Sequence, residues 1–259
     1  MRGDFLNVLK EHGYAWGPVV GDGRTVDPGT IAHGTTVLAM KYRDGVLVAG
    51  DRRATAGNLV MHDRTDKVLD LDRHSVLAIA GVPATAFEMA RVLDHSFKYY
   101  RRSQLQELSL DGKLRALSTL LRNNVPMAVQ GIGAVAPIFA GYDLATGSGK
   151  IFFYDILGAE FEGVEYAASG SGSPTIRGVM YYLHRWGPQV IAQLDATDAT
   201  VLVLRLLESA AEFDSATGGI KKGDDLYPVV KLVTSEGIAP VPAEHLQRLY
   251  AEHVENRRV

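Results

Sequence analysis

The chain has 259 residues, a formal net charge of −3, 46% hydrophobic and 22% charged residues, and no cysteine. This balance is ordinary for a globular protein that can bury a core, and it gives no basic surface for nucleic acid or acidic membranes. The lack of cysteine excludes disulfides, thiolate metal sites and a cysteine nucleophile. No apolar run approaches the ~20 residues of a membrane span, and residues 1–20 lack the apolar core of a secretory signal, so we expect a cytoplasmic protein.

The composition changes near residue 34. Residues 17–34 hold five glycines and two prolines without helical or strand periodicity, which is typical of a linker or a removable arm. Two apolar runs follow, over 35–42 and 46–51, and the Asp44-Gly45 pair between them strongly indicates a hairpin.

Further elements follow from apolar periodicity and turn signals. The predicted strands cover 75–80, 137–142, 150–154, 164–168 and 227–234. The predicted helices cover 83–100, 110–121, 175–186, 197–213 and 242–255. Consecutive strands joined by tight turns favour antiparallel sheets, and helices that arrive in pairs favour an α+β architecture with helices outside packed sheets.

Thr35 stands at a Gly-Thr junction that directly opens a predicted strand. If the arm were cut off there, the new N-terminus would combine a hydroxyl nucleophile with its own α-amine, whose pKa near ~8 suits a proton acceptor at neutral pH. Gly-Thr pairs are common, so an ordinary strand residue is the alternative.

Two charged residues are candidates to assist Thr35. Asp51 ends the second strand of the predicted hairpin, and Lys67 lies in a short polar stretch before an apolar pair. A lysine beside an aspartate and a developing alkoxide would stabilise anionic oxygen and lower the pKa of the hydroxyl. The alternative for each is a solvated surface charge.

Gly81 and Asp214 have unusual positions. Gly81 precedes a predicted helix, where its N–H would point toward an oxyanion, although a plain turn glycine explains it equally well. Asp214 ends an apolar helix, where the dipole disfavours an acid, and Ser215-Ala216-Thr217-Gly218-Gly219 follows it. This pattern indicates a hydrogen-bonded turn that serves a site, with a solvated helix end as the alternative.

From Thr35 onward the chain resembles the proteasome β subunits over nearly its whole remaining length. The residues that carry the resemblance are Thr35-Thr36-Val37, Gly50-Asp51-Arg52-Arg53-Ala54-Thr55, Lys67, Ala80-Gly81, Gly170-Ser171-Gly172-Ser173-Pro174 and Asp214-Ser215-Ala216-Thr217-Gly218-Gly219. Each segment is short, but their order and spacing together are highly specific. The arm resembles the propeptide of a catalytically active, actinobacterial-type subunit.

The resemblance implies a role for each matching position. Thr35 would be the nucleophile, with Asp51 and Lys67 as its charged partners. Ser171 and Asp214 would position the N-terminal amine and a water molecule.

Other positions would complete the site. Thr217 stands where many relatives have serine and keeps the hydroxyl, Gly81 would donate to the oxyanion, and Arg53 would support the site. Thr55 and Gly81 would pair with the substrate backbone as an added strand. The pocket for the residue before the cut would be lined by Ala54, Thr65, Leu69, Ile79, Pro83 and Phe87, an uncharged set that predicts a preference for hydrophobic residues.

The resemblance also implies a fold and partners. The fold would be that of the N-terminal nucleophile hydrolases, a four-layer αββα sandwich of two antiparallel sheets, over residues 35–259. A propeptide, residues 1–34, would be removed by self-cleavage between Gly34 and Thr35. Seven-membered β rings would stack with α-subunit rings, and an ATP-dependent unfoldase would deliver unfolded proteins, in actinobacteria often marked with a ubiquitin-like tag. No metal, cofactor, nucleic acid or membrane is implied.

Three alternatives compete with this interpretation. The simpler two-ring HslV-type protease is disfavoured by the length, the long arm and the Asp214 motif. A catalytically silent structural subunit is disfavoured because Thr35, Asp51 and Lys67 occur together. A small-molecule amidase with an N-terminal nucleophile is disfavoured by the match around Ser171 and the substrate-binding segment.

Overall fold

A computed structural model describes residues 5, 8, 11, 12, 34–56, 59–162, 164–221, 223 and 226–255. Most of the predicted arm, residues 1–34, therefore lies outside the described residues, whereas Gly34 at its end is described. No helix within the described part of the chain is long and apolar enough to cross a membrane.

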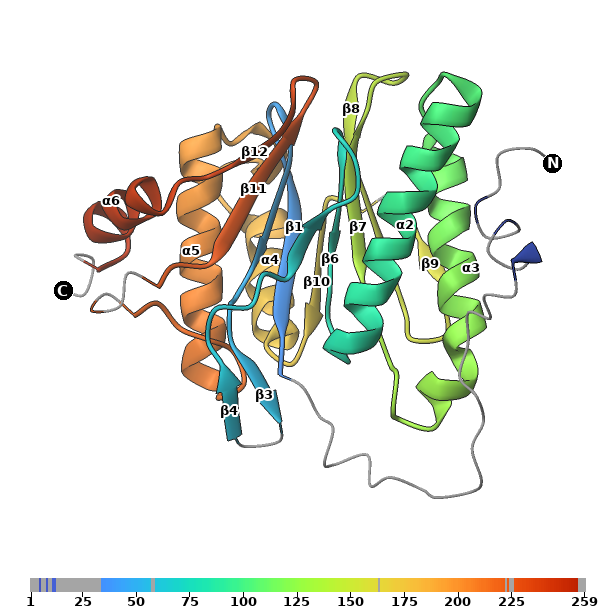
Figure 1. Ribbon diagram of the computed structural model, residues 1–259. Helices are drawn as coiled ribbons and strands as arrows, with labels where there is room; N and C mark the ends of the chain where they lie inside the picture. Colours follow the sequence, from blue (N-terminus) through green and yellow to red (C-terminus); the bar gives the residue numbers. More distant parts are fainter. Residues whose placement is uncertain are drawn as a thin grey trace.

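Two five-stranded antiparallel sheets lie face to face between layers of helices (Figure 1). The strand order in the first sheet is β10 (Tyr166–Gly170), β1 (Thr36–Tyr42), β2 (Gly45–Gly50), β11 (Val229–Thr234) and β12 (Gly237–Pro240). The order in the second is β5 (Val68–Asp70), β6 (Ser75–Ala78), β7 (Ile138–Asp143), β8 (Ser148–Tyr154) and β9 (Glu160–Phe161). A separate pair consists of β3 (Ala54–Ala56) and β4 (Leu59–His62).

The helices cover the outer faces of the two sheets (Figure 1). The second sheet is covered by α2 (Pro83–Gln104) and α3 (Leu110–Val129). The first sheet is covered by α4 (Ser173–Trp186) and α5 (Ala196–Phe213), with α6 (Ala243–His253) and the short η2 (Ile191–Gln193) packed against the same apolar cluster. The predicted α+β sandwich is confirmed.

The central strands are apolar on both faces because each face is covered. Along β1, Val37 and Ala39 contact the second sheet, while Leu38 and Met40 contact the helices. This period of two, with both sets buried, explains why residues 35–42 have no polar alternation.

The long predicted elements are present, and the differences concern ends and short strands. The strand predicted over 164–168 occurs as β10, two residues later, and the strand predicted over 227–234 begins at Val229. The sequence analysis missed β3, β4, β5, β9 and β12. Each has only two to four residues, too few for a periodic pattern to be recognised.

The start of β1 lies at one end of the sandwich, beside the β3–β4 pair (Figure 1). Thr36 is opposite Gly170 of β10, and Val37 is opposite Gly50 of β2. Because β1 lies between these two antiparallel neighbours, the residues that follow both of them, Ser171 and Asp51, are brought to its first residues.

Candidate active site

The main chain of Thr35 and Thr36 is held from both sides at the entrance to β1. The N–H of Ser171 donates to the carbonyl of Thr35 at 2.9 Å, and the N–H of Asp51 donates to the carbonyl of Thr36 at 3.0 Å. Thr35 is 4% exposed. The predicted hairpin therefore places the candidate nucleophile next to the predicted aspartate.

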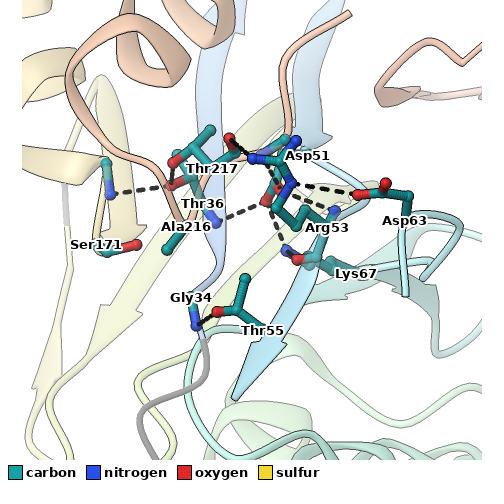
Figure 2. A network of polar contacts seen from close by, with 12 residues as sticks. Gly34, Thr36, Asp51, Arg53, Thr55, Asp63, Lys67, Ser171, Ala216 and Thr217 are labelled. Atoms are coloured by element: carbon teal, nitrogen blue, oxygen red, sulfur yellow. Dashed lines mark hydrogen bonds and ion pairs between the residues drawn. The ribbon is translucent and has the colours of Figure 1, made fainter. Parts of the chain in front are cut away.

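Asp51 is buried and is bound by four donors. Its Oδ1 accepts from the N–H of Thr36 at 2.8 Å and from Nζ of Lys67 at 2.6 Å. Its Oδ2 accepts from the N–H groups of Arg53, at 2.9 Å, and Gly218, at 2.8 Å. Four donors match the capacity of an ionised carboxylate, so its orientation is set by contacts from three separate segments (Figure 2).

Lys67 lies directly before β5 and is 2% exposed. Besides Asp51, its Nζ donates to the carbonyl of Arg53 at 2.5 Å. Burial lowers the pKa of the Lys67 ammonium below its ordinary 10.5, while the neighbouring Asp51 charge opposes that shift. A buried amine with a lowered pKa beside the first residues of β1 is suited to proton transfer or to stabilising an anion. The solvated-charge alternative is wrong for both Asp51 and Lys67.

A second polar group lies on the opposite side of β1, around Asp214. Oδ2 of Asp214 accepts from the hydroxyls of Ser171, at 2.6 Å, and Thr217, at 2.5 Å. The Thr217 hydroxyl is also 2.6 Å from the hydroxyl of Thr36, which accepts from the N–H of Gly172 at 3.0 Å. Because the carboxylate only accepts, the hydroxyls point in one direction, from Thr36 through Thr217 to Asp214.

The hydrogen bonds to Asp214 change its acidity. Partial burial by itself raises the pKa of this carboxyl, but hydrogen bonds from Ser171, Thr217 and the N–H of Ala216, together with the Lys67 charge, bring it below the ordinary 3.8. The carboxylate form is therefore favoured in the folded protein.

The turn after α5 connects the two polar groups. Asp214 ends α5, its Oδ1 accepts from the N–H of Ala216 at 3.1 Å, and its carbonyl accepts from the N–H of Thr217 at 3.0 Å. Gly218, one residue further, donates to Asp51. The predicted hydrogen-bonded turn is present, although Asp214 itself is only partly buried.

Gly34 lies in a position with no room for a side chain. A Cβ atom there would come within 2.0 Å of the Cβ of Ala216 and 2.8 Å of Oγ1 of Thr55. The N–H of Gly34 donates to the same Thr55 oxygen at 2.8 Å (Figure 2). The chain entering Thr35 is therefore held by β3 on one side and by the turn after α5 on the other.

Gly81 has a backbone conformation that requires glycine. Its φ is +114°, and a Cβ would lie 2.1 Å from the carbonyl oxygen of Ala134. It forms a bridge with Val135 and directly precedes Val82, the N-cap of α2. It is outside the hydrogen-bonded network around Asp51, although α2 starts at the same end of the sandwich as β1 (Figure 1).

The structure brings together part of the predicted pocket. Leu69, Ile79 and Phe87 meet in the apolar cluster beneath α2, and the N–H of Ile79 donates to the carbonyl of Lys67 at 2.9 Å. Ile79 is only 3% exposed, so it offers little surface to a ligand. The remaining predicted members lie on neighbouring segments: Ala54 on β3, Thr65 bonded through its N–H to the carbonyl of Arg52, and Pro83 in the first turn of α2.

Arg53 links the segments that surround the site. Its side chain donates to Asp63 at 3.2 Å and to the carbonyl of Ser215 at 2.9 Å. Asp63 also accepts from Lys221, and hydrogen bonds from Lys221 and Arg53 lower the pKa of its carboxyl. The supporting position implied for Arg53 agrees with these contacts.

The sequence analysis did not identify Thr36 and Gly218 as site residues, although both lie in the quoted motifs. Each contributes a backbone N–H to Asp51. A main-chain donor has no side-chain signature, so only closeness in sequence to Thr35 and Asp214 could have indicated them.

Two antiparallel sheets between helical layers, with a threonine entering a central strand beside a buried lysine–aspartate pair, define an N-terminal nucleophile hydrolase architecture. The family model described as "Proteasome subunit" matches residues 31–221. The chain belongs to the proteasome subunit family.

Three curated relatives of the chain are actinobacterial proteins that are named as proteasome β subunits. It is 40% identical over 228 residues to "Proteasome subunit beta 2" of Thermomonospora curvata, covering 88% of this chain and 79% of the relative. It is 37% identical over 239 residues to "Proteasome subunit beta 1" of Streptomyces avermitilis, covering 91% and 82%. It is 38% identical over 225 residues to "Proteasome subunit beta" of Streptomyces griseus, covering 87% and 78%.

Proposed function

We propose that the chain is the precursor of a catalytic β subunit of a 20S proteasome core, a threonine-type endopeptidase with Thr35 as nucleophile. The observation that carries this proposal is the shared oxygen of Asp51, which binds both Nζ of Lys67 and the N–H of Thr36. A buried ion pair attached to the residue beside Thr35 serves no evident packing purpose, because an apolar pair of similar volume fills such a space at no loss of stability.

Processing comes first in this proposal. The Thr35 hydroxyl attacks the carbonyl carbon of Gly34, so that the peptide bond becomes an ester, and water then hydrolyses the ester. The products are a carboxylate on Gly34, ending a propeptide of residues 1–34, and a free α-amine on Thr35. The catalytic domain is then residues 35–259.

Peptide hydrolysis uses the same hydroxyl. The Thr35 hydroxyl attacks the substrate carbonyl carbon, the C–N bond breaks, and the leaving amine takes up the hydroxyl proton. Water then hydrolyses the ester of the acyl-enzyme, which releases the carboxylate product and restores the hydroxyl. Ser171 and Asp214, with Thr217, position the new amine and a water molecule, and the N–H of Gly81 donates to the oxyanion. The first proton acceptor is the α-amine of Thr35 or Lys67.

Substrate recognition in this proposal relies on the backbone. Thr55 and Gly81 bind an extended peptide as an added strand. Leu69 and Phe87, both partly buried in one apolar cluster, would contribute to an uncharged pocket for the residue before the cut. That supports a preference for hydrophobic residues there.

The proposed assembly follows from the family. The relatives are named as β subunits of the proteasome, which supports heptameric β rings stacked with α-subunit rings in the cytoplasm. An ATP-dependent unfoldase would deliver unfolded, tagged proteins to the enclosed sites.

The test is the intact mass of the chain after co-expression with an α-type partner, compared with Thr35→Ala. Loss of 34 residues in the wild type alone, with hydrolysis of a hydrophobic fluorogenic peptide, supports the proposal. If both chains keep the arm in assembled rings, the enzyme proposal fails and a structural subunit takes its place. If the wild type cleaves only small amides and no unfolded protein, the amidase alternative is favoured.

A further inference from the structure

Lys231 is a single lysine within the apolar strand β11. Side chains alternate along a strand, so Lys231 shares a face with Val229 and Val233, which pack in the apolar cluster between the two sheets. In the register of the first sheet it lies opposite Val48 of β2, another member of that cluster. Its side chain is 11% exposed. An ammonium in this layer is costly unless it has partners.

The partners of Lys231 all lie on the second sheet, around β5. Its Nζ donates to the carbonyl of Val68 at 2.5 Å and to Oδ1 of Asp70 at 3.0 Å, and Oδ2 of Asp66 is 3.8 Å away. Lys231 therefore connects β11 to the residues on either side of Lys67, Asp66 and Val68.

The contact with Val68 gives a hydrogen-bond donor to a main-chain carbonyl on an edge strand. Among the strands that the structure describes, β5 is the first of its sheet and pairs with β6 alone. The carbonyl of Lys67 points toward β6, where it accepts from the N–H of Ile79 at 2.9 Å. Because successive carbonyls point to opposite sides, that of Val68 points to the free edge, where it has no strand to pair with.

Side chains replace the missing strand at this edge. The carbonyl of Val68 accepts from Lys231, and the N–H of Val68 donates to Oδ1 of Asp66 at 2.9 Å. Both main-chain groups of the residue next to Lys67 are thus bound without a neighbouring strand. β5 has only three residues, so few other hydrogen bonds determine where its first residue lies.

We propose that Lys231 is a positioning residue for Lys67. By holding the carbonyl of Val68, it sets the backbone from which the Lys67 side chain reaches Asp51. This inference rests on the proposed function of Lys67. A displacement of about 1 Å in a reacting group can cost roughly a hundredfold in rate, so a loosened β5 edge would act on the chemical step.

The test compares Lys231→Met with Lys113→Met in assembled particles. Methionine keeps the apolar length and removes the charge and the donor. Lys113 is a matched control, since its side chain is 12% exposed and its Nζ lies 2.6 Å from Asp72, which follows the C-terminal end of β5. The measurements are melting temperature, kcat and KM on a hydrophobic fluorogenic peptide, and the rate of arm removal followed by intact mass.

We expect both variants to melt at lower temperature, but only Lys231→Met to lose kcat, by roughly tenfold or more with KM within about twofold, because positioning acts on the transition state. Arm removal should slow in parallel. Equal kcat in the two variants would overturn the proposal and leave Lys231 a stability residue. If Lys231→Met does not assemble, Lys231→Leu, which also lacks the charge and the donor, is judged by its kcat relative to Lys113→Met and by its rate of arm removal.

The wild type and Thr35→Ala are measured beside them. Hydrolysis that persists in assembled Thr35→Ala particles would contradict the proposed function itself. If Thr35→Ala is inactive, as the proposed function requires, but Lys231→Met keeps full kcat, only the positioning role of Lys231 is contradicted.

Discussion

Thr36 and Lys67 donate to the same carboxylate oxygen, Oδ1 of Asp51, at 2.8 and 2.6 Å. One donor is the backbone of the residue after the candidate nucleophile, and the other is an ammonium from the opposite sheet. A shift of Asp51 therefore changes the position of both. Asp51 therefore links the start of β1 directly to the lysine.

Replacing Asp51 with asparagine should leave the Lys67 ammonium buried without a counter-charge. Breaking one partner of a buried ion pair costs about 3–5 kcal/mol, so the free energy of unfolding should fall by that amount. Chemical denaturation of the precursor measures it, and intact mass should show the arm retained. Asp63→Asn is the control, since its side chain is 25% exposed and should matter less. Wild-type processing in Asp51→Asn would argue against a role in the chemistry.

Gly34→Ala should slow removal of the arm, because its methyl group would come within 2.0 Å of the Cβ of Ala216. The backbone must move away from Thr35 or from the turn after α5 to relieve that contact. The time course of intact mass after synthesis gives the rate. Adding Ala216→Gly removes the nearest obstructing atom, while Oγ1 of Thr55 at 2.8 Å remains, so the double variant should recover part of the lost rate. If Gly34→Ala loses its arm at the wild-type rate, the junction has room for a methyl group at residue 34.

At Thr217 the contribution of the side-chain hydroxyl can be measured separately from that of the methyl group. Thr217→Val keeps the shape but removes the hydroxyl that joins Thr36 to Asp214, so the Thr36 hydroxyl loses its acceptor and Oδ2 of Asp214 keeps only the Ser171 hydroxyl. An unmade buried hydrogen bond costs about 1–3 kcal/mol. Thr217→Ser keeps the hydroxyl and loses a methyl group, at a cost of about 0.5–1.5 kcal/mol. Peptide hydrolysis should drop in the valine variant and persist in the serine variant. The reverse order would mean that packing, not hydrogen bonding, determines what this position does.

Asp214 should give the protein a stability that depends on acidity. Its folded-state pKa lies below the ordinary 3.8, so between these two values the unfolded chain binds more protons than the folded one. The stabilisation is complete above 3.8 and is lost as the pH falls through the lower, folded-state value. The difference in melting temperature between wild type and Asp214→Asn should therefore be constant near neutrality and shrink in strong acid. A difference that does not change with pH would contradict this titration.

The elements that the sequence predicted are those with long local patterns. The hairpin over 35–51 follows from two apolar runs and an Asp-Gly turn, and it alone brings Asp51 to Thr35. The helices follow from three- and four-residue spacing. The importance of Asp214 was indicated by an acid at an unfavourable helix end.

The parts that could not be predicted depend on contacts far apart in sequence or on the main chain. Lys231 and Val68 are 163 residues apart, and no local pattern connects them. The N–H of Gly218 is a donor that every residue except proline carries. The strand β5 has three residues, so its position at the sheet edge is a consequence of tertiary packing.

The hydrogen bond from Gly34 to Thr55 has a consequence for when the protein can act. The N–H of Gly34 donates to the side-chain oxygen of Thr55, so the uncut chain lies against the residue that is proposed to pair with substrate, and a peptide cannot lie there until the 34–35 bond is broken. Such inhibition is intramolecular, so a newly made subunit is blocked equally well at any concentration. It also ends irreversibly with one cleavage, so each subunit is active only after its own 34–35 bond has been cut.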